Sequence, residues 1–164
     1  MTERELTAAD LDALLALQRA TYAGLARREF LVQTEPEELV YIFGGGGAGL
    51  GVFDGERLVG AWMLYYPFGR SDNLGLLLNR DPMTAAHFEL ALLDPAYRGR
   101  GLHREMVRRL TETAARDGRF TCILATAHPD NAASVRGFTA CGYENLGVYK
   151  LYGGLDRCVL CKPL

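Results

Sequence analysis

The chain has 164 residues, 49% of them hydrophobic and 23% charged, which is typical of one soluble globular domain with its own core. The net charge of -2 argues against a nucleic-acid-binding protein, no apolar run reaches the roughly 20 residues of a membrane span, and the N-terminus lacks the apolar segment of a secretory signal. We therefore expect a single domain over residues 1–164, located in the cytoplasm, with no nucleic-acid partner and no membrane contact.

The hydrophobic pattern predicts the order β-α-α-β-β-β-α-β-α-β-β, with Thr7 and Asp10 forming a capping box at the first helix. The sequence shows no internal repeat and no linker, so we predict one mixed α/β domain. The predicted elements are a strand at 3–7, helices at 8–25 and 36–42, hairpin strands at 50–53 and 58–66, a strand at 85–93, a helix at 101–116, a strand at 121–127, a helix that follows 131 and runs to 141, and strands at 143–152 and 155–161.

Two further features receive a structural interpretation. The glycine run at 44–47 has no following Lys-Ser or Lys-Thr and precedes a strand pattern, so we expect a flexible loop there. Cys158 and Cys161 form a C-x-x-C pair, but residues three apart on a strand face opposite sides of the sheet. We therefore predict reduced, structural cysteines and no metal site.

The stretch 90–110, LALLDPAYRGRGLHREMVRRL, is the most informative part of the chain. An apolar run ends at Asp94-Pro95, a turn with Gly99 and Gly101 follows, and a helical pattern begins at once. The first N–H groups of a helix have no intrahelical partner, and the helix dipole places about half a positive charge there. Because the two glycines carry no side chain that would keep a phosphate away, the junction predicts a phosphate-binding site.

Two motifs in this half of the chain resemble those of a known family. DPAYRGRGLHREMVRRL resembles the acyl-CoA pyrophosphate loop and helix of the GNAT superfamily of N-acetyltransferases, with the signature Gln/Arg-x-x-Gly-x-Gly/Ala. NAASVRGFTACGY, at 131–143, resembles the family's next motif, an Asn that opens a helix ending in Gly-Phe/Tyr. The element order also matches, so the resemblance covers nearly the full chain and implies an α/β (α+β) fold, in which a mixed, mostly antiparallel, splayed central sheet is flanked by helices.

The resemblance implies that acetyl-CoA is the cofactor. The strand that ends at Leu93 would splay from its neighbour, and backbone groups around Leu92 and Leu93 would pair with the pantetheine arm, which Asn131 would also contact. The pyrophosphate would be bound by the amides of the glycine turn, which in this sequence belong to Arg98, Gly99, Arg100, Gly101, Leu102 and His103.

Three positions depart from the family pattern. Ala96 stands where Gln or Arg is usual. His103 stands where Gly or Ala is frequent, as either a solvated residue or a direct phosphate contact. Phe138, seven residues after Asn131, replaces the Tyr that many members use as the proposed general acid for the departing thiolate. That role would pass to another group, to water or to nothing. Tyr149 and Tyr152 are alternative acids, although hairpin packing also explains each of them.

The implied reaction is direct attack of a primary amine on the acetyl thioester. Glu89 alternates with Ala91 and Leu93 on the central strand, so we expect it to share their face. It is our candidate for the general base, the alternative being a structural ion pair. His87, on the same face, is the second candidate, and its alternative is a hydrogen-bonded histidine at the end of the strand.

The predicted function is therefore an acetyl-CoA-dependent N-acetyltransferase whose acceptor is an amine of a small molecule or a peptide. A non-catalytic acyl-CoA-binding or sensing domain remains an alternative because of Phe138 and Ala96. A nucleotide-binding module is disfavoured, because no P-loop lysine follows either glycine turn. The resemblance is compatible with a homodimer formed through the C-terminal strands, which the sequence does not require.

Overall fold

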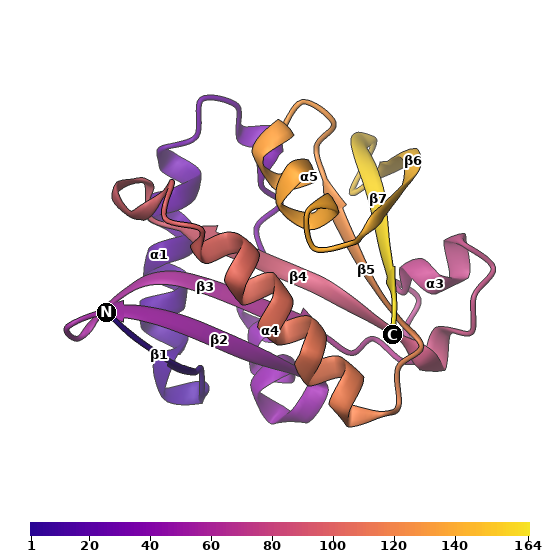
Figure 1. Cartoon of the computed structure of the whole chain (residues 1–164), viewed down its shortest axis with the longest axis horizontal. Coiled ribbons are helices and arrows are strands. Elements are labelled where there is room, and N and C mark those ends of the chain that lie inside the picture. The colour runs from indigo at the N-terminus through magenta and orange to yellow at the C-terminus, as the bar shows by residue number, and fades with distance from the viewer.

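The computed structural model describes all 164 residues, and its centre is one seven-stranded sheet in the order β1-β2-β3-β4-β5-β7-β6 (Figure 1). All neighbouring strands are antiparallel except β4 and β5, which are parallel. This confirms the predicted mixed, mostly antiparallel sheet. The strands are β1 (Thr2–Glu5), β2 (Gly47–Asp54), β3 (Arg57–Tyr65), β4 (Ala85–Leu93), β5 (Cys122–Ala127), β6 (Glu144–Leu151) and β7 (Leu155–Pro163).

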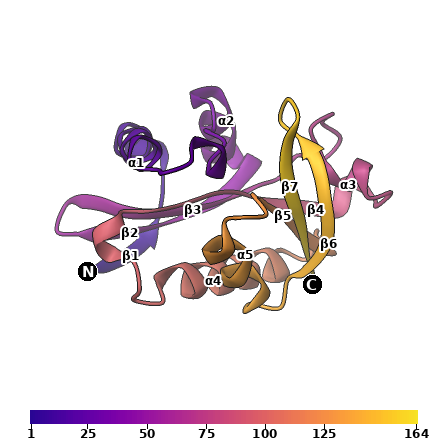
Figure 2. The same cartoon turned by 90° about the horizontal axis from the view of Figure 1, so that it is seen from above.

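Helices cover both faces of the sheet, and each face has its own apolar core. Figure 2 shows α1 and α2 on one face, and α4 and α5 on the other. Trp62 of β3 packs with Met106 and Leu110 of α4, whereas Leu90 of β4 packs with Leu14 of α1. No helix is both long and apolar enough to span a membrane. The helices are α1 (Leu11–Ala23), α2 (Pro36–Tyr41), α3 (Leu74–Leu77), α4 (Leu102–Asp117) and α5 (Ala132–Thr139).

The predicted element order is confirmed, and the differences are local. Thr7 and Asp10 form the predicted capping box, but residues 8–10 are a 3-10 turn that precedes α1. The segment 67–80, which the sequence shows only as a polar insertion, contains the four-residue helix α3. A helix of one turn is too short to produce a periodic pattern. The 44–47 glycine run is not an independent loop, because it continues α2 through a π turn and leads directly into β2.

The strands β4 and β5 separate in the middle of the sheet. They are paired only at Ala85–Phe88 of β4 and Cys122–Ala125 of β5. Beyond this point β4 continues to pair with β3 as far as Leu93, and β5 continues to pair with β7 as far as Ala127. The edge of β4 from residue 89 to 93 is therefore open toward β5, which confirms the predicted splay.

A β-bulge in β4 corrects one prediction. Phe88 pairs with Leu64 and Leu90 pairs with Met63, so Glu89 has no partner on β3. The extra residue reverses the alternation of side chains. Ala91 and Leu93 therefore pack on the α4 face, as Phe88 does, whereas the Glu89 carboxylate meets Thr34, in the segment between α1 and α2. The expectation that Glu89 shares a face with Ala91 and Leu93 is wrong for this reason.

Candidate active site

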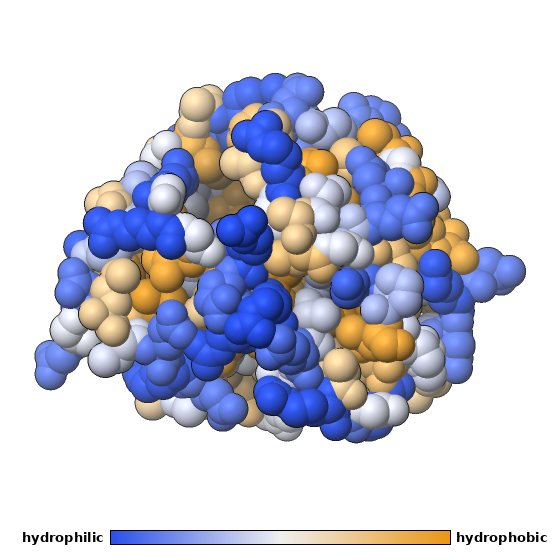
Figure 3. All heavy atoms as spheres, in the orientation of Figure 1, coloured by the Kyte–Doolittle hydropathy of each residue, from blue (hydrophilic) through white to orange (hydrophobic).

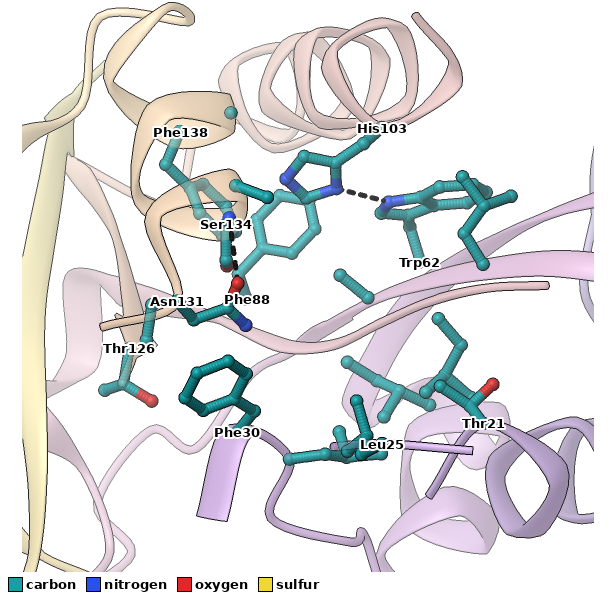
Figure 4. A pocket seen from close by; sticks show the side chains of 18 of the residues that line it. Thr21, Leu25, Phe30, Trp62, Phe88, His103, Thr126, Asn131, Ser134 and Phe138 are labelled. Atoms are coloured by element: carbon teal, nitrogen blue, oxygen red, sulfur yellow. Dashed lines mark hydrogen bonds between the residues drawn. The ribbon is translucent and has the colours of Figure 1, made fainter. Parts of the chain in front are cut away.

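A cavity of about 710 Å³ lies where β4 and β5 separate. Figure 3 shows a hollow between α5 and the N-terminal end of α4, and Figure 4 shows the side chains around it. The segment after α1, the open end of β4, the glycine turn, the end of β5, α5 and the β6–β7 hairpin all contribute to its wall. Most of the predicted cofactor residues line it, namely Leu92, Leu93, Arg98, Gly99, Gly101, Leu102, His103, Asn131 and Phe138.

The glycine turn presents unpaired donors at one end of this cavity. The backbone N–H groups from Gly99 to Arg104 donate no hydrogen bond within the chain. Gly99 and Gly101 have φ values of +75° and +78°, and a Cβ at either position would meet open space. Such a run of amides at the N-terminus of a sixteen-residue helix fits a pyrophosphate group.

The arginines of the turn differ in their placement. Arg98 and Arg104 line the cavity, and Arg104 was not among the predicted residues. Arg100 instead lies over the ring of Tyr97, at 4.9 Å from its centre, and its Nη2 donates to the carbonyl of Ala96 at 3.3 Å. The Arg100 side chain is thus directed away from the cavity, and Arg100 can contact a ligand in the turn only through its backbone amide.

Two further features suit an extended amide-containing ligand such as pantetheine. The edge of β4 around Leu92 and Leu93 is free on the side toward β5, so a ligand can pair with it as an added strand. The N–H of Asp94 donates to Val59 of β3, so the alternation of an antiparallel ladder directs the N–H and C=O of Leu93 toward the free side. Asn131 caps α5 through its Oδ1, which accepts from the N–H of Ser134 at 3.3 Å (Figure 4). Its Nδ2 has no partner in the chain and is available to a carbonyl group of a ligand.

His103 is not a solvated first-turn residue. Its Nδ1 accepts a hydrogen bond from Nε1 of Trp62 at 3.0 Å, and its ring meets Phe138 edge-on at 5.3 Å between ring centres (Figure 4). Burial lowers the pKa of His103 to about 4, so the ring is neutral at pH 7. Its Nε2–H is buried without a partner, against Gly137. The His103 side chain therefore adds no positive charge to the glycine-turn end of the cavity. Only the backbone amide of His103 is available to bind a phosphate there.

Phe138 lines the cavity at the position where the sequence resemblance implies a tyrosine, so this position of α5 offers no proton donor. Of the two alternative tyrosines, the structure brings only Tyr152 to the cavity. Its hydroxyl lies 3.3 Å from Oγ1 of Thr126 on β5, and burial raises the pKa of Tyr152 above its usual value.

Glu89 lines the same cavity and is held by a chain of hydrogen bonds. Oγ1 of Thr34 donates to Oε1 of Glu89 at 3.2 Å. The backbone of Thr34 is fixed by Gln18 of α1, whose Nε2 donates to the Thr34 carbonyl at 2.9 Å and whose Oε1 accepts from the Thr34 N–H at 3.0 Å. Burial, and then the negative charge of Glu38, raise the pKa of Glu89 to about 7. Sequence reasoning missed Thr34 and Gln18, because neither lies in a motif and Thr34 is 55 positions from Glu89.

His87 is not brought to the cavity. Its Nε2 accepts a hydrogen bond from the N–H of Leu74 in α3 at 3.1 Å, and its ring packs edge-on against Tyr65. Burial lowers the pKa of His87 to about 4. The structure thus places His87 as a hydrogen-bonded residue that anchors α3, and Glu89 remains the candidate base. No group of three His, Cys, Asp or Glu side chains is arranged to hold a metal ion.

Comparisons with known proteins agree with this geometry. The chain is similar to yncA from Salmonella typhimurium, solved with its cofactor acetyl-CoA, at 19% identity and a TM-score of 0.74, over 99% of this chain and 93% of that one. It is also similar to the ribosomal-protein-alanine N-acetyltransferase of Brucella melitensis, at 24% identity and a TM-score of 0.73 over 100% of both chains.

A third similar structure is the aminoglycoside acetyltransferase AAC(6')-Ib in complex with coenzyme A and kanamycin, at 20% identity and a TM-score of 0.72, over 99% of this chain and 94% of that one. A sequence comparison with curated proteins gives no match. Residues 2–144, however, match the acetyltransferase (GNAT) domain family, which is most of the chain. The protein therefore belongs to the GNAT family of acetyltransferases.

Proposed function

We propose that the protein is an acetyl-CoA-dependent N-acetyltransferase that acetylates a primary amine of a small molecule or peptide. One observation carries the proposal: a single cavity joins the unpaired amides from Gly99 to Arg104 to the carboxylate of Glu89, with its pKa of about 7. The similar structures support both the proposed cofactor and the proposed class of acceptor. yncA is solved with acetyl-CoA, and the aminoglycoside acetyltransferase AAC(6')-Ib with coenzyme A and kanamycin. The Brucella melitensis protein is named for acetylation of a ribosomal protein.

Acetyl-CoA, when bound, supplies the acetyl thioester. The turn amides from Gly99 to Arg104 would hold its pyrophosphate, because hydrogen bonds to a charged acceptor contribute about 1.5–3 kcal/mol each. The N–H of Arg98, which the sequence resemblance included in this set, instead donates to the carbonyl of Pro95 at 3.2 Å. The free edge of Leu92 and Leu93, with the Nδ2 of Asn131, would hold the pantetheine arm. Phe138 forms an apolar wall and offers no proton. A thiol with a pKa near 8.5 is a fair leaving group without a proton donor.

Glu89 would remove the proton from the attacking amine, directly or through one water. An alkyl amine with a pKa near 10.4 is neutral in only about 1 of 10³ molecules at pH 7, so a base is useful. A carboxylate with an ordinary pKa is a weak base, and the raised pKa of about 7 brings Glu89 into the effective range. Thr34 and Gln18 would fix the orientation of its carboxylate.

The test combines cofactor binding with thiol release. Acetyl-CoA is expected to raise Tm, and a panel of amines to release thiol at a rate that increases with pH through an inflection near 7. Glu89→Gln keeps the Tm rise, lowers kcat by about 10²–10⁴-fold and loses the inflection. The proposal is overturned if acetyl-CoA leaves Tm unchanged, or if Glu89→Gln has full activity.

The second candidate, a non-catalytic acyl-CoA-binding domain, rests on Phe138 in place of the family's tyrosine. It would give the same rise in Tm with acetyl-CoA, but no thiol release with any amine. Comparing the two readouts on one preparation therefore separates the candidates.

A further inference from the structure

One buried cation in the cavity has no counterion, in contrast to the exposed Arg98 and Arg104. Arg157 of β7 lines the wall, and only 2% of its surface is exposed. No carboxylate lies within ion-pair distance of its guanidinium. The two acidic residues that Arg157 contacts through their backbone are already paired, Glu29 with Arg27 at 2.9 Å and Asp156 with Lys150 at 2.7 Å.

The chain satisfies Arg157 only in part. Nη2 donates to the backbone carbonyl of Glu29 at 2.6 Å and Nη1 to that of Asp156 at 3.4 Å. A guanidinium has five N–H groups, so the remaining ones, including that on Nε, have no partner. Neutral carbonyls do not offset a full charge, and burial lowers the pKa of Arg157 below its usual value, which is the sign of this cost. By contrast, the buried carboxylate of Asp10 pairs with Arg4 at 2.7 Å.

Arg157 lies on a different wall of the cavity from the predicted cofactor residues. It comes from β7 and contacts the segment after α1, whereas the predicted cofactor residues belong to β4, the glycine turn and α5. Its guanidinium is 5.9 Å from the ring centre of Tyr152, whose hydroxyl reaches Thr126 on the strand that splays from β4. The side of the cavity between Glu89 and Arg157 is thus left for the acceptor.

We propose that Arg157 binds a carboxylate of the acceptor, so that the substrate is an amine that also carries a carboxylate group. The proposal rests on the proposed function, with the amine directed to Glu89 and the carboxylate to Arg157. A carboxylate matches the single uncompensated charge and the remaining donors of one guanidinium. A phosphate would need more positive charge, and the neighbouring Arg27 is engaged by Glu29 and Asp130.

A purely structural role makes a different prediction. Through the Glu29 carbonyl, Arg157 also ties the segment after α1 to β7. Loss of a tether would affect all acceptors alike, whereas loss of a carboxylate site affects only acceptors with a carboxylate. The matched control is Arg27→Gln, because Arg27 holds the same segment through Asp130 and does not line the cavity.

The experiment compares a linear series of amino acids of increasing length with their carboxamides, in thiol release with acetyl-CoA. The unmodified protein is expected to prefer the acid of the best-fitting length in kcat/KM. Arg157→Gln removes this preference by raising KM for the acid about 10²-fold, with little change for the carboxamide. Arg157→Lys retains part of the preference, and Arg27→Gln retains all of it.

Binding is measured in parallel as the rise in Tm that each acid gives in the presence of CoA, so the site is tested even without turnover. Stabilisation by acids that Arg157→Gln abolishes supports the proposal, and absence of thiol release would then count only against the proposed function. The inference is overturned if acids and carboxamides bind and react equally well, or if Arg157→Gln weakens both to the same extent.

Discussion

Glu89 owes its position to the bulge in β4, where it lies between the paired residues Phe88 and Leu90 and has no partner on β3 itself. The bulge turns its carboxylate toward Thr34 while Phe88 and Leu93 stay in the α4 core. The pKa of Glu89 is raised by burial and then by Glu38 of α2, with a smaller contribution from Asp72 after β3, and only Thr34 acts in the opposite direction.

Thr34→Val tests the hydrogen bond that tunes this base. Valine keeps the shape of threonine but cannot donate, so the carboxylate loses stabilisation and the pKa of Glu89 rises. The inflection in the pH profile of kcat/KM is expected to move to higher pH, with activity recovered at high pH. Thr34→Ser, which keeps the donor, is the control and should leave the inflection in place. An unchanged profile in Thr34→Val would show that the threonine does not act on Glu89.

At the scale of single elements, the glycine turn and the C-terminus of α4 provide a matched pair. Gly101 precedes α4 with φ +78° and ψ -2°, and Gly118 follows it with φ +75° and ψ -6°. An alanine at either position would meet open space, so both substitutions carry a similar left-handed strain of about 1–2 kcal/mol. Gly101 belongs to the proposed phosphate site, whereas Gly118 lies at the opposite end of α4.

We expect Gly101→Ala and Gly118→Ala to lower Tm to a similar extent. Only Gly101→Ala should weaken acetyl-CoA binding, by about tenfold or more, because its methyl group would occupy space next to the turn amides. Isothermal titration with acetyl-CoA measures the difference. Equal affinities in the two variants would argue against a pyrophosphate at this turn.

The docking of α5 on α4 depends on the absence of a side chain at Gly137. A Cβ there would lie 2.3 Å from Cδ2 and 2.6 Å from Nε2 of His103, whose ring is fixed between Trp62 and Phe138. Gly137→Ala should therefore destabilise the protein by about 1–3 kcal/mol through overpacking. In a His103→Ala background the clash is absent, and the same change should be neutral or stabilising, because alanine is the better helix former. Thermal unfolding of the four proteins shows the change of sign, and equal effects in both backgrounds would contradict it.

The sequence predicts these elements well and their contacts poorly. Periodicity and capping signals give the order of the strands and helices, and the glycine turn gives the anion site, because each depends on neighbouring residues. The bulge at Glu89 depends on how β3 pairs with β4, so strict alternation misplaced that side chain. The Gln18–Thr34–Glu89 chain and the buried charge of Arg157 arise from residues far apart in the sequence, and no local pattern reports them.

In the whole molecule, the splay of β4 from β5 creates the cavity at the expense of sheet pairing. Residues 89–93 of β4 have no hydrogen-bonded strand on the side toward β5. The groups that line the gap include the Glu89 carboxylate, with its raised pKa, and the Arg157 guanidinium, which has no counterion. The site is therefore less stable than a closed sheet would be, and part of this cost should appear in the stability of the protein.

Glu89→Gln is expected to stabilise the protein at high pH while it removes activity. The pKa of Glu89 is about 7 in the folded protein and 4.5 as the ordinary value, so the folded state binds more protons between these pH values. The stability contributed by the protonated group is fully present below pH 4.5 and is lost as the pH rises through 7. Glutamine never ionises, so the variant keeps this stability at high pH. At pH 8 it should therefore be more stable than the unmodified protein by roughly 1–3 kcal/mol, or about 3–10 °C in Tm.

This difference should vanish by about pH 4.5, where the carboxyl group is neutral in both proteins. The buried neutral His87 and His103, with pKa values of about 4, destabilise both proteins equally as the pH falls below 6.5, so they cancel in the comparison. Glu56→Gln, in the exposed turn between β2 and β3, is the control and should match the unmodified protein at every pH. A Tm difference for Glu89→Gln that is independent of pH would mean that Glu89 is not desolvated in the folded protein, and the basis for its role as a base at pH 7 would be lost.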